Sequence, residues 1–385
     1  MTDGAVRRVA AVDCGTNSIR LLVADVEVAG PDGPAAPAVG ALHDVVRRME
    51  VVRLGEGVDR TGRISEAAME RALGRSREYA EQCADLSVSA VRFVATSAAR
   101  DAGNAEDFAA GVRAAFAEHG HDGVVPEVIT GDEEAELSFL GATGDLAAAG
   151  IPGPYLVVDL GGGSTELVRG TAEGAVEAAR SVDMGCVRHA ERYLHHDPPT
   201  ADELAAALAE VDRQLDLACS TVELAGVRTL VGVAGTVTTV TAHAMGLAAY
   251  DPEVIHLSRL PADVVRAACA DLVHLDRPSR AALPFMHPGR VDVIGPGALI
   301  WGRIVERVVG AGADDLVVSS EHDILDGVCL RLAGSVDGPR EAGHGPTLGG
   351  ARAPGSVQFR AGGDSPRPDH LSRWAVDLVE LQDRR

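Results

Sequence analysis

Two similar segments decide the fold: VAAVDCGTNSIRLLVAD at residues 9–25 and YLVVDLGGGSTELVRG at residues 155–170. Aligned without gaps, both contain an apolar run that ends in Asp, a Gly-rich turn with a Ser, and a second apolar run. Each segment predicts a β-hairpin whose turn is built from small residues. Because the hairpins are separated by roughly half of the folded chain, they indicate that one domain has been duplicated.

The rest of the sequence alternates between strand and helix patterns. The β-branched run at 88–96 predicts a strand. Ser65 and Asn104 are expected to cap helices that follow them, and Thr200 with Glu203 predicts a capping box. Hairpins combined with this alternation predict an α/β protein with mixed sheets flanked by helices.

The chain is expected to divide into three segments. Residues 1–133 and 134–333 would form the two related domains. From residue 334 the sequence is rich in Gly and Pro without a repeat, which predicts a disordered tail. Apolar residues at helical spacing between 371 and 381 predict a terminal helix, which either docks on the protein itself or binds a partner.

The composition excludes several classes of function. The 385 residues carry a net charge of -22, which disfavours nonspecific binding to DNA or to anionic membranes. Only 3% of the residues are aromatic, which disfavours base-stacking surfaces for single-stranded nucleic acid. No apolar run reaches the roughly 18 residues of a membrane span. We therefore expect neither a nucleic-acid partner nor a membrane partner.

The charged residues and the cysteines restrict how the protein can bind an anion and where in the cell it is expected. The sequence contains no Lys, so any bound anion must be held by Arg, by backbone N–H groups or through a metal. The six Cys are scattered without a C-x-x-C pair, which fits reduced thiols rather than disulfides. The segment MTDGAVRRVAAVDCG has no secretory apolar region or cleavage site. A cytoplasmic location is the expectation.

The Gly-rich turns are candidate phosphate sites. In DCGTNS (13–18) and DLGGGS (159–164), small residues let backbone N–H groups approach phosphate oxygens. Asp13 and Asp159 repel phosphate directly, but they suit a divalent cation that bridges to it. A plain tight turn explains either copy alone, and also the weaker turn VGVAGT (231–236), whose helix start could receive a phosphate. The candidate phosphate ligands are Gly15, Thr16, Asn17, Ser18, Gly161, Gly162, Gly163, Ser164 and Gly235.

An acidic cluster lies at the expected domain boundary. Asp132, Glu133, Glu134 and Glu136 occupy the start of a predicted helix, where acidic residues are ordinary because of the helix dipole. Crowded carboxylates also raise one another's pKa, which suits one of them to take a proton from water. Both interpretations stay open on these residues alone.

Positive charge near the turns must come from Arg. Arg20, Arg100, Arg280 and Arg290 are candidates, because a polyanion bound to an acidic protein needs local positive charge. Each is also consistent with a solvated surface residue. The runs at 195–197 and 321–323 contain His and acidic residues, but we interpret them as a loop and a helix start, not as metal ligands.

The chain resembles the exopolyphosphatase/guanosine pentaphosphate phosphatase family, within the superfamily of actin, sugar kinases and heat-shock chaperones. The resemblance extends from about Val9 to Leu332 and rests on ordered motifs: VDCGTNSIRLLVAD, VATSAARDAGN, ITGDEEAELSF, VVDLGGGSTELV, MGCVRH, VGVAGT and RVDVIGPGAL. It implies two duplicated actin-like (ribonuclease H-like) domains with an active site in the cleft between them.

The resemblance also implies an activity and roles for residues. Family members hydrolyse the terminal phosphoanhydride of inorganic polyphosphate, or the 5′-phosphate of guanosine pentaphosphate, with Mg²⁺ or Mn²⁺. The catalytic base for water would be Glu134, the second residue of the E-E-A motif. Arg100 would contact phosphate, and Asp13, Asp159 and Glu166 would hold the metal or its waters. A homodimer is implied by the resemblance alone.

The chain departs from the family pattern at two positions. Glu136 and Leu325 stand where family members often carry Arg, and the helical domains of long members are absent. This short two-domain form indicates a preference for short polyphosphate chains. Two alternatives remain: a sugar or acid kinase of the same superfamily, and a non-catalytic protein that binds polyphosphate or an alarmone such as guanosine tetraphosphate.

Overall fold

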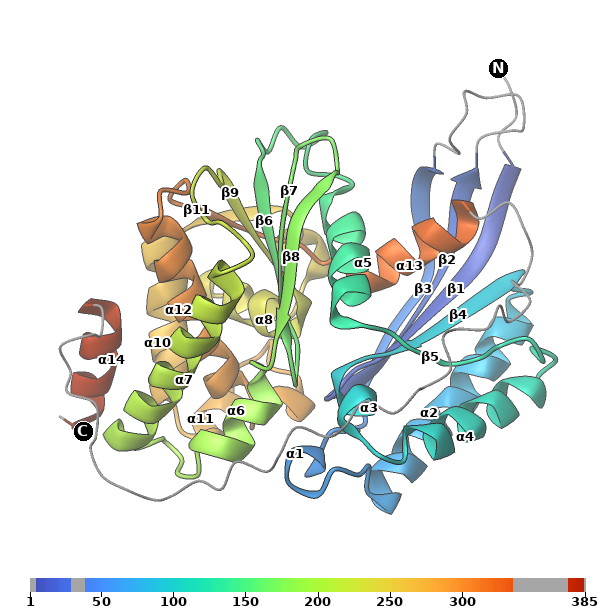
Figure 1. Ribbon diagram of the computed structural model, residues 1–385, viewed down its shortest axis with the longest axis horizontal. Helices are drawn as coiled ribbons and strands as arrows, with labels where there is room; N and C mark the ends of the chain where they lie inside the picture. Colours follow the sequence, from blue (N-terminus) through green and yellow to red (C-terminus); the bar gives the residue numbers. More distant parts are fainter. Residues whose placement is uncertain (1–4, 29–38, 335–372, 384–385) are drawn as a thin grey trace.

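Two mixed β-sheets, each covered by helices, form the two halves of the protein (Figure 1). The computed structural model describes residues 5–28, 39–334 and 373–383. The duplicated α/β architecture expected from the sequence is confirmed by the strand order of the two sheets, given below.

The first sheet has the strand order β3-β2-β1-β4-β5. β1 and β2 form the first hairpin, β3 continues it antiparallel, and β4 and β5 add parallel strands on the other side of β1. Asp13, near the end of β1, faces Arg20 of β2 in this register. The strands are β1 Ala5–Cys14, β2 Ser18–Val28, β3 Val39–Val51, β4 Ala90–Ala95 and β5 Glu127–Val128.

The second sheet repeats this order and adds one edge strand, giving β10-β11-β9-β6-β7-β8. β6 and β7 form the second hairpin, and β9 and β11 are parallel to β6 as β4 and β5 are to β1. Asp159 faces Glu166, so Glu166 occupies the place that Arg20 has in the first copy. The strands are β6 Tyr155–Leu160, β7 Thr165–Gly170, β8 Val176–Val182, β9 Thr229–Val233, β10 Ser258–Pro261 and β11 Leu316–Ser319.

Helices cover both faces of each sheet. In the first half, α2 and α4 bury one face, while α13 buries the other. In the second half, α5 covers one face, and α7, α8, α10 and α12 cover the other. The helices are α1 Val58–Thr61, α2 Glu66–Asp85, α3 Ser97–Asp101, α4 Ala105–Ala117, α5 Gly131–Thr143, α6 Cys186–Tyr193, α7 Ala201–Cys219, α8 Ala234–Ala244, α9 Pro252–Ile255, α10 Ala262–His274, α11 Arg277–Ala281, α12 Ile294–Gly310, α13 Ile324–Gly334 and α14 Arg373–Asp383.

The two middle helices, α5 and α13, lie between the sheets and cross each other closely (Figure 1). A Cβ at Gly141 of α5 would lie 1.8 Å from the carbonyl oxygen of Asp323, and one at Gly327 of α13 would lie 2.0 Å from that of Leu137. Only glycine permits so close an approach of two backbones. α13 packs on the first sheet although it follows the second sheet in sequence. The domain boundary expected between residues 133 and 134 stays a prediction.

Two of the three predicted helix caps are present. Ser65 accepts a hydrogen bond from the backbone N–H of Ala68, and Thr200 with Glu203 forms the full capping box. Asn104 precedes α4 but makes no side-chain cap. Its amide instead bonds the N–H and the C=O of Ile64, so it ties two loops together.

The terminal helix α14 packs against α7 of the second half, which supports the self-docking interpretation. Trp374 donates from Nε1 to the carbonyl oxygen of Arg266, and Ala375 and Leu378 are buried. The tail between α13 and α14, predicted to be disordered, lies outside the described residues. Among the helices of the described ranges, none combines the length and apolar character required to cross a membrane.

Candidate active site

The two hairpin turns meet at a cavity of about 90 Å³ between the halves of the protein. Residues of both turns line it, together with the start of α5 and the start of α8. Twelve of the fourteen site residues expected from the sequence lie on its wall: Asp13, Gly15, Thr16, Asn17, Ser18, Glu134, Asp159, Gly161, Gly162, Gly163, Ser164 and Gly235. Arg100 and Glu166 lie behind the wall.

The two turns are near-copies that touch each other. In the first turn the N–H of Gly15 donates to the carbonyl oxygen of Ser18 at 2.9 Å, and in the second Gly161 donates to Ser164 at 3.0 Å. A Cβ at Gly163 would lie 2.7 Å from the Thr16 Oγ1 across the gap. The sequence therefore needs glycine where the second turn meets the first.

Neighbouring backbone holds both turns in place through their carbonyl oxygens. Thr16 and Asn17 accept backbone bonds from residues 52–55, and Gly161 and Gly162 accept them from residues 186–188 at the start of α6. The turns are thus fixed before any ligand arrives, which is the arrangement that an anion cradle requires.

Glu134 lies in the first turn of α5 with its carboxylate on the cavity wall. Glu134 is 8% exposed. Arg100 donates from Nη1 to Glu134 Oε2 at 2.6 Å and to the carbonyl oxygen of Ile129 at 3.0 Å. Burial raises the pKa of Glu134 to about 7; Arg100 opposes this rise, and the nearby Asp159 and Asp13 add to it. The carboxyl group can therefore exchange a proton near neutral pH.

The cavity wall also offers oxygen donors for a cation. Asp13 Oδ1 and Thr16 Oγ1 are buried without a hydrogen-bond partner among the residues that the structure describes. Asp159 accepts from Ser138 Oγ at 2.6 Å, and burial raises the pKa of Asp159 to about 6, with the nearby Asp323 adding to the rise. An orphaned carboxylate oxygen beside a second buried carboxylate fits a divalent cation such as Mg²⁺, which binds through one or two carboxylates and water.

Glu166 fits this cation site less well than Asp13 and Asp159. Glu166 is 1% exposed and lies behind the cavity wall. Its carboxylate accepts a hydrogen bond from Ser181 Oγ at 2.7 Å. Burial and the nearby Glu134 raise the pKa of Glu166 well above its ordinary value.

The Arg candidates have different environments. Arg20 lines the cavity, but it forms ion pairs with Asp13 and Asp323. Arg290 also lines it and donates from Nη1 to the carbonyl oxygen of Gly235 at 2.7 Å. Arg280 points elsewhere and pairs with Asp197, one of the residues interpreted as a loop. Only two of the four candidates are thus placed to meet a ligand in the cavity.

Several residues of the site were not singled out by their sequence context. Cys186, Thr236, Thr96 and Ser97 all line the cavity. Ser138 supports Asp159 from one helical turn after Glu134, a spacing that places both on the same face of α5. That spacing is a signal that could have identified Ser138 in advance.

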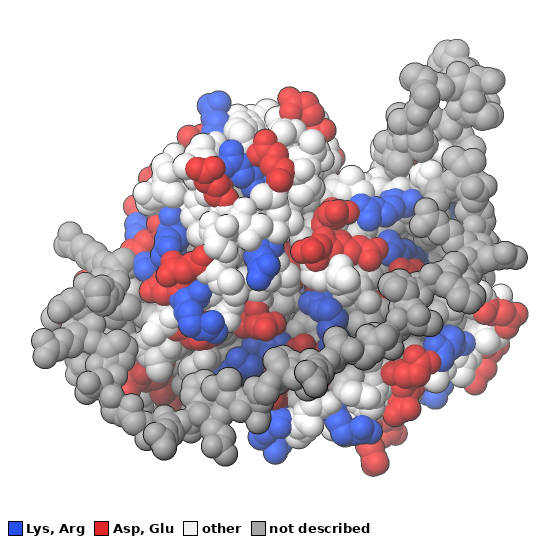
Figure 2. Space-filling view, in the orientation of Figure 1, with Lys and Arg blue, Asp and Glu red and all other residues white. Residues whose placement is uncertain are grey.

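A second, larger cavity of about 410 Å³ adjoins the first and shares Arg20, Ala234, Gly235 and Arg290 with it. Its volume lies within the range of small-molecule sites, about 300–1,000 Å³. Its wall combines apolar and aromatic side chains, among them Met49, Tyr250, Pro284, Phe285 and Met286, with charged ones, among them Arg47, Arg48, Glu321 and Asp323. On the face that Figure 2 shows, Arg and acidic side chains are interspersed, without a continuous basic tract.

Comparisons identify similar proteins in sequence and structure. Residues 35–327 match the model of the Ppx/GppA phosphatase family. The chain is 50% identical over 331 residues, 86% of its length and 100% of the relative's, to Exopolyphosphatase 2 of Mycobacterium tuberculosis. It is 34% identical over 228 residues, 59% of its length and 42% of the relative's, to the guanosine-5′-triphosphate,3′-diphosphate pyrophosphatase of Aeromonas salmonicida. A crystal structure of an exopolyphosphatase-like protein matches with a TM-score of 0.77 at 44% identity, over 85% of this chain and 98% of that one.

Proposed function

Because this chain belongs to the Ppx/GppA phosphatase family and is a phosphoanhydride hydrolase, we propose that it removes the terminal phosphate of inorganic polyphosphate or of guanosine pentaphosphate. One observation carries the proposal: Glu134, with a pKa of about 7, faces a phosphate-sized cavity formed by two glycine-rich turns. The name of the Mycobacterium tuberculosis relative supports polyphosphate, and that of the Aeromonas salmonicida relative supports the nucleotide.

The mechanism begins with the terminal phosphoryl group between the two turns. Glu134 takes a proton from a water molecule, whose oxygen forms a bond to phosphorus while the anhydride P–O bond breaks. The shortened chain leaves with the electrons of that bond, and Arg100 holds the Glu134 carboxylate in position. A divalent cation held by Asp13 and Asp159 would neutralise negative charge on the phosphate oxygens.

The second cavity favours a nucleotide among the candidate substrates. A phosphate chain seated in the first cavity would extend past Arg290 and Gly235, which line both cavities. The adjoining wall offers Tyr250, Phe285 and Met286 as apolar surface for a purine ring, beside arginines that can meet further phosphates. We propose on this ground that guanosine pentaphosphate is cleaved alongside short polyphosphate.

The test is phosphate release from a ladder of polyphosphates and from guanosine pentaphosphate, each with and without Mg²⁺ or Mn²⁺. We expect release from both substrate types and its loss when a chelator removes the metal. Release only from polyphosphate would refute the nucleotide assignment, and metal-independent release would refute the cation site.

The same assay separates the two alternatives. A kinase requires an acceptor hydroxyl, so free phosphate formed without any acceptor excludes it. A non-catalytic binder would bind guanosine tetraphosphate or polyphosphate in calorimetry without releasing phosphate. The cytoplasmic location and the homodimer remain predictions; light scattering of the full chain tests the dimer.

A further inference from the structure

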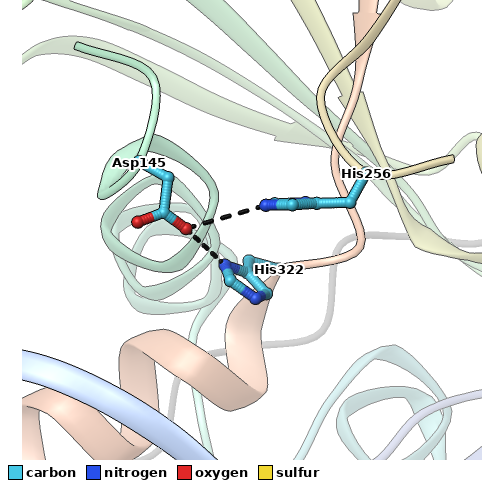
Figure 3. Close-up of side chains that lie close together, drawn as sticks. All are labelled: Asp145, His256 and His322. Carbon is cyan, nitrogen blue, oxygen red and sulfur yellow. Dashed lines mark ion pairs between the residues drawn. The ribbon is translucent and has the colours of Figure 1, made fainter. Parts of the chain in front are cut away.

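Three side chains outside the phosphate cavity converge near the crossing of α5 and α13 (Figure 3). Asp145 follows the end of α5, His256 follows α9, and His322 lies between β11 and α13. In Figure 3 both imidazole rings point toward the Asp145 carboxylate. Three chain segments that are distant in sequence thus meet at one point.

Their spacing is that of metal ligands. The distance from Asp145 Oδ2 to His322 Nδ1 is 2.9 Å, and to His256 Nε2 it is 3.6 Å. Ligand atoms around a tetrahedral zinc ion are separated by about 3.3 Å, given metal–ligand bonds of about 2.0–2.2 Å. Among the described residues this is the one group of three potential ligands whose atoms all lie within 4.8 Å of one another.

The donor set selects the class of metal. Two imidazoles and one carboxylate suit zinc and neighbouring transition metals, whereas Mg²⁺ and Ca²⁺ prefer oxygen ligands throughout. A histidine ligand binds such an ion through its neutral imidazole. The side chains of Asp145 and His322 are 53% and 33% exposed, so an ion can reach them from solvent.

We propose that Asp145, His256 and His322 form a binding site for one divalent transition-metal ion such as Zn²⁺, separate from the oxygen-lined phosphate cavity. His322 belongs to the run 321–323, which the sequence alone led us to interpret as a helix start without metal ligands; its two partners here are remote in sequence. Water would complete the coordination on the solvent side.

Metal binding requires one local change. His256 Nδ1 now accepts a hydrogen bond from the backbone N–H of Glu321 at 3.3 Å, so the ring proton lies on Nε2, facing Asp145. When Nε2 of His256 binds the metal, the ring proton moves from Nε2 to Nδ1. Nδ1 can then no longer accept the hydrogen bond from the backbone N–H of Glu321. Three coordination bonds replace it.

The site would fasten the helix crossing that joins the two halves. Asp145 follows α5, whose other end carries Glu134, and His322 precedes Asp323, which pairs with Arg20 on the cavity wall. An ion held by both segments therefore resists their separation, so metal binding should stabilise the folded protein.

The test titrates the full chain with Co²⁺, as a spectroscopic substitute for Zn²⁺, in millimolar Mg²⁺ that saturates oxygen-only sites. We expect one Co²⁺ per chain with the visible absorption of a low-coordinate site, displaced by Zn²⁺. Asp145→Asn, His256→Gln and His322→Gln should each weaken binding by about 100-fold or more. The thermal midpoint should rise with Zn²⁺ in the wild type and in none of these variants.

His196→Gln is the matched control, because His196 also pairs with a carboxylate, Glu203, at 2.8 Å, but within the described ranges no third potential ligand joins them. It should bind Co²⁺ as the wild type does. The proposal is overturned if the wild type binds no Co²⁺, or if the three variants bind it undiminished. Should one variant fail to fold, the other two decide the outcome, and none of these readouts depends on phosphatase activity.

Discussion

Glu134 is subject to opposing effects of burial and charge. Burial and the carboxylates of Asp13 and Asp159 favour its protonated form, while Arg100 favours its ionised form. The result is a pKa of about 7, near the value that serves a general base at neutral pH. Arg100 also fixes the direction of the carboxylate, which the acidic cluster alone would not do.

Replacing Glu134 tests its role directly. Glu134→Gln keeps the shape and removes the base, so kcat for phosphate release should fall by about 10²–10⁴-fold while substrate binding changes little. Glu136→Gln on the same helix is the control, because Glu136 is exposed and pairs only at the surface with Arg331. Wild-type turnover by Glu134→Gln would remove Glu134 from the mechanism.

The same group should govern the pH profile of the reaction. In the proposed mechanism the ionised form of Glu134 is the active one, so kcat should rise with pH and level off above about 7, the pKa of this group. The rate of phosphate release measured from pH 5 to 9 checks this. A profile that is flat across pH 7 would contradict the assignment.

Stability should respond to pH in the opposite direction. The folded pKa of Glu134, about 7, exceeds its ordinary value of 4.5, so the folded state holds more protons between these values. The contribution of this group to the free energy of unfolding is therefore largest below about pH 4.5 and is lost as the pH rises through 7. Denaturant titrations should show a smaller decline over this range in Glu134→Gln than in the wild type.

At the scale of elements, glycines set how closely the parts of the site approach. The second turn rests on the first at Gly163, and α5 crosses α13 at Gly141 and Gly327. In each case a methyl group would meet atoms that cannot all move aside. The two contacts differ in purpose, since one shapes the cavity and the other joins the halves.

Gly163→Ala should damage the cavity more than the fold. Its Cβ would lie 2.4 Å from Ser97 Oγ and 2.7 Å from Thr16 Oγ1, so the second turn must shift away from the first. A displacement of about 1 Å can cost about 10²-fold in rate, and we expect a loss in kcat/KM of that order. Gly74→Ala in α2 is the control, because nothing lies within 4 Å of its Cβ position; an equal loss there would refute the argument.

Gly141→Ala should instead destabilise the whole protein. The added Cβ would lie 1.8 Å from the backbone carbonyl oxygen of Asp323, which only a separation of α5 and α13 relieves. We expect the free energy of unfolding to fall by about 3 kcal/mol or more, measured by chemical denaturation. Gly144→Ala, at the end of the same helix with open space around it, should change it by less than about 1 kcal/mol.

At the scale of the whole molecule, ion pairs hold the two halves together beside the cavity. Arg188 and Arg192 of α6 both bond Asp59 of α1, and Arg188 also pairs with Asp101 at the end of α3. Arg188 is 9% exposed and donates from Nε to the carbonyl oxygen of Gly163 at 2.7 Å. The contact between the halves is therefore connected directly to the second glycine-rich turn.

Asp59→Ala should favour separation of the halves. It leaves the buried Arg188 without one carboxylate partner, at a cost of about 1–3 kcal/mol to the closed arrangement. We expect kcat/KM to fall by roughly tenfold, with the loss expressed mainly in KM. Glu106→Ala removes an ion pair with Arg113 that lies within α4, and it should leave kcat/KM unchanged. Equal effects of the two variants would contradict a role of Asp59 between the halves.

The sequence by itself determined the duplicated α/β fold, both glycine-rich turns and the acidic helix start, because these features are local. Apolar periodicity, small turn residues and capping residues act over a few positions, and two matched hairpins carry the repeat. Asn104 shows the limit of local patterns, since its amide bonds a loop forty positions earlier instead of capping its own helix.

Only the tertiary structure decided which side chains reach the cavity. It placed Arg100 behind Glu134, paired Arg20 with Asp13 and Asp323, and brought His256 and His322 to Asp145. It also packed α13 on the first sheet, across the boundary that sequence order suggested. Burial and pairing depend on contacts between segments that are remote along the chain, and no local pattern encodes those contacts.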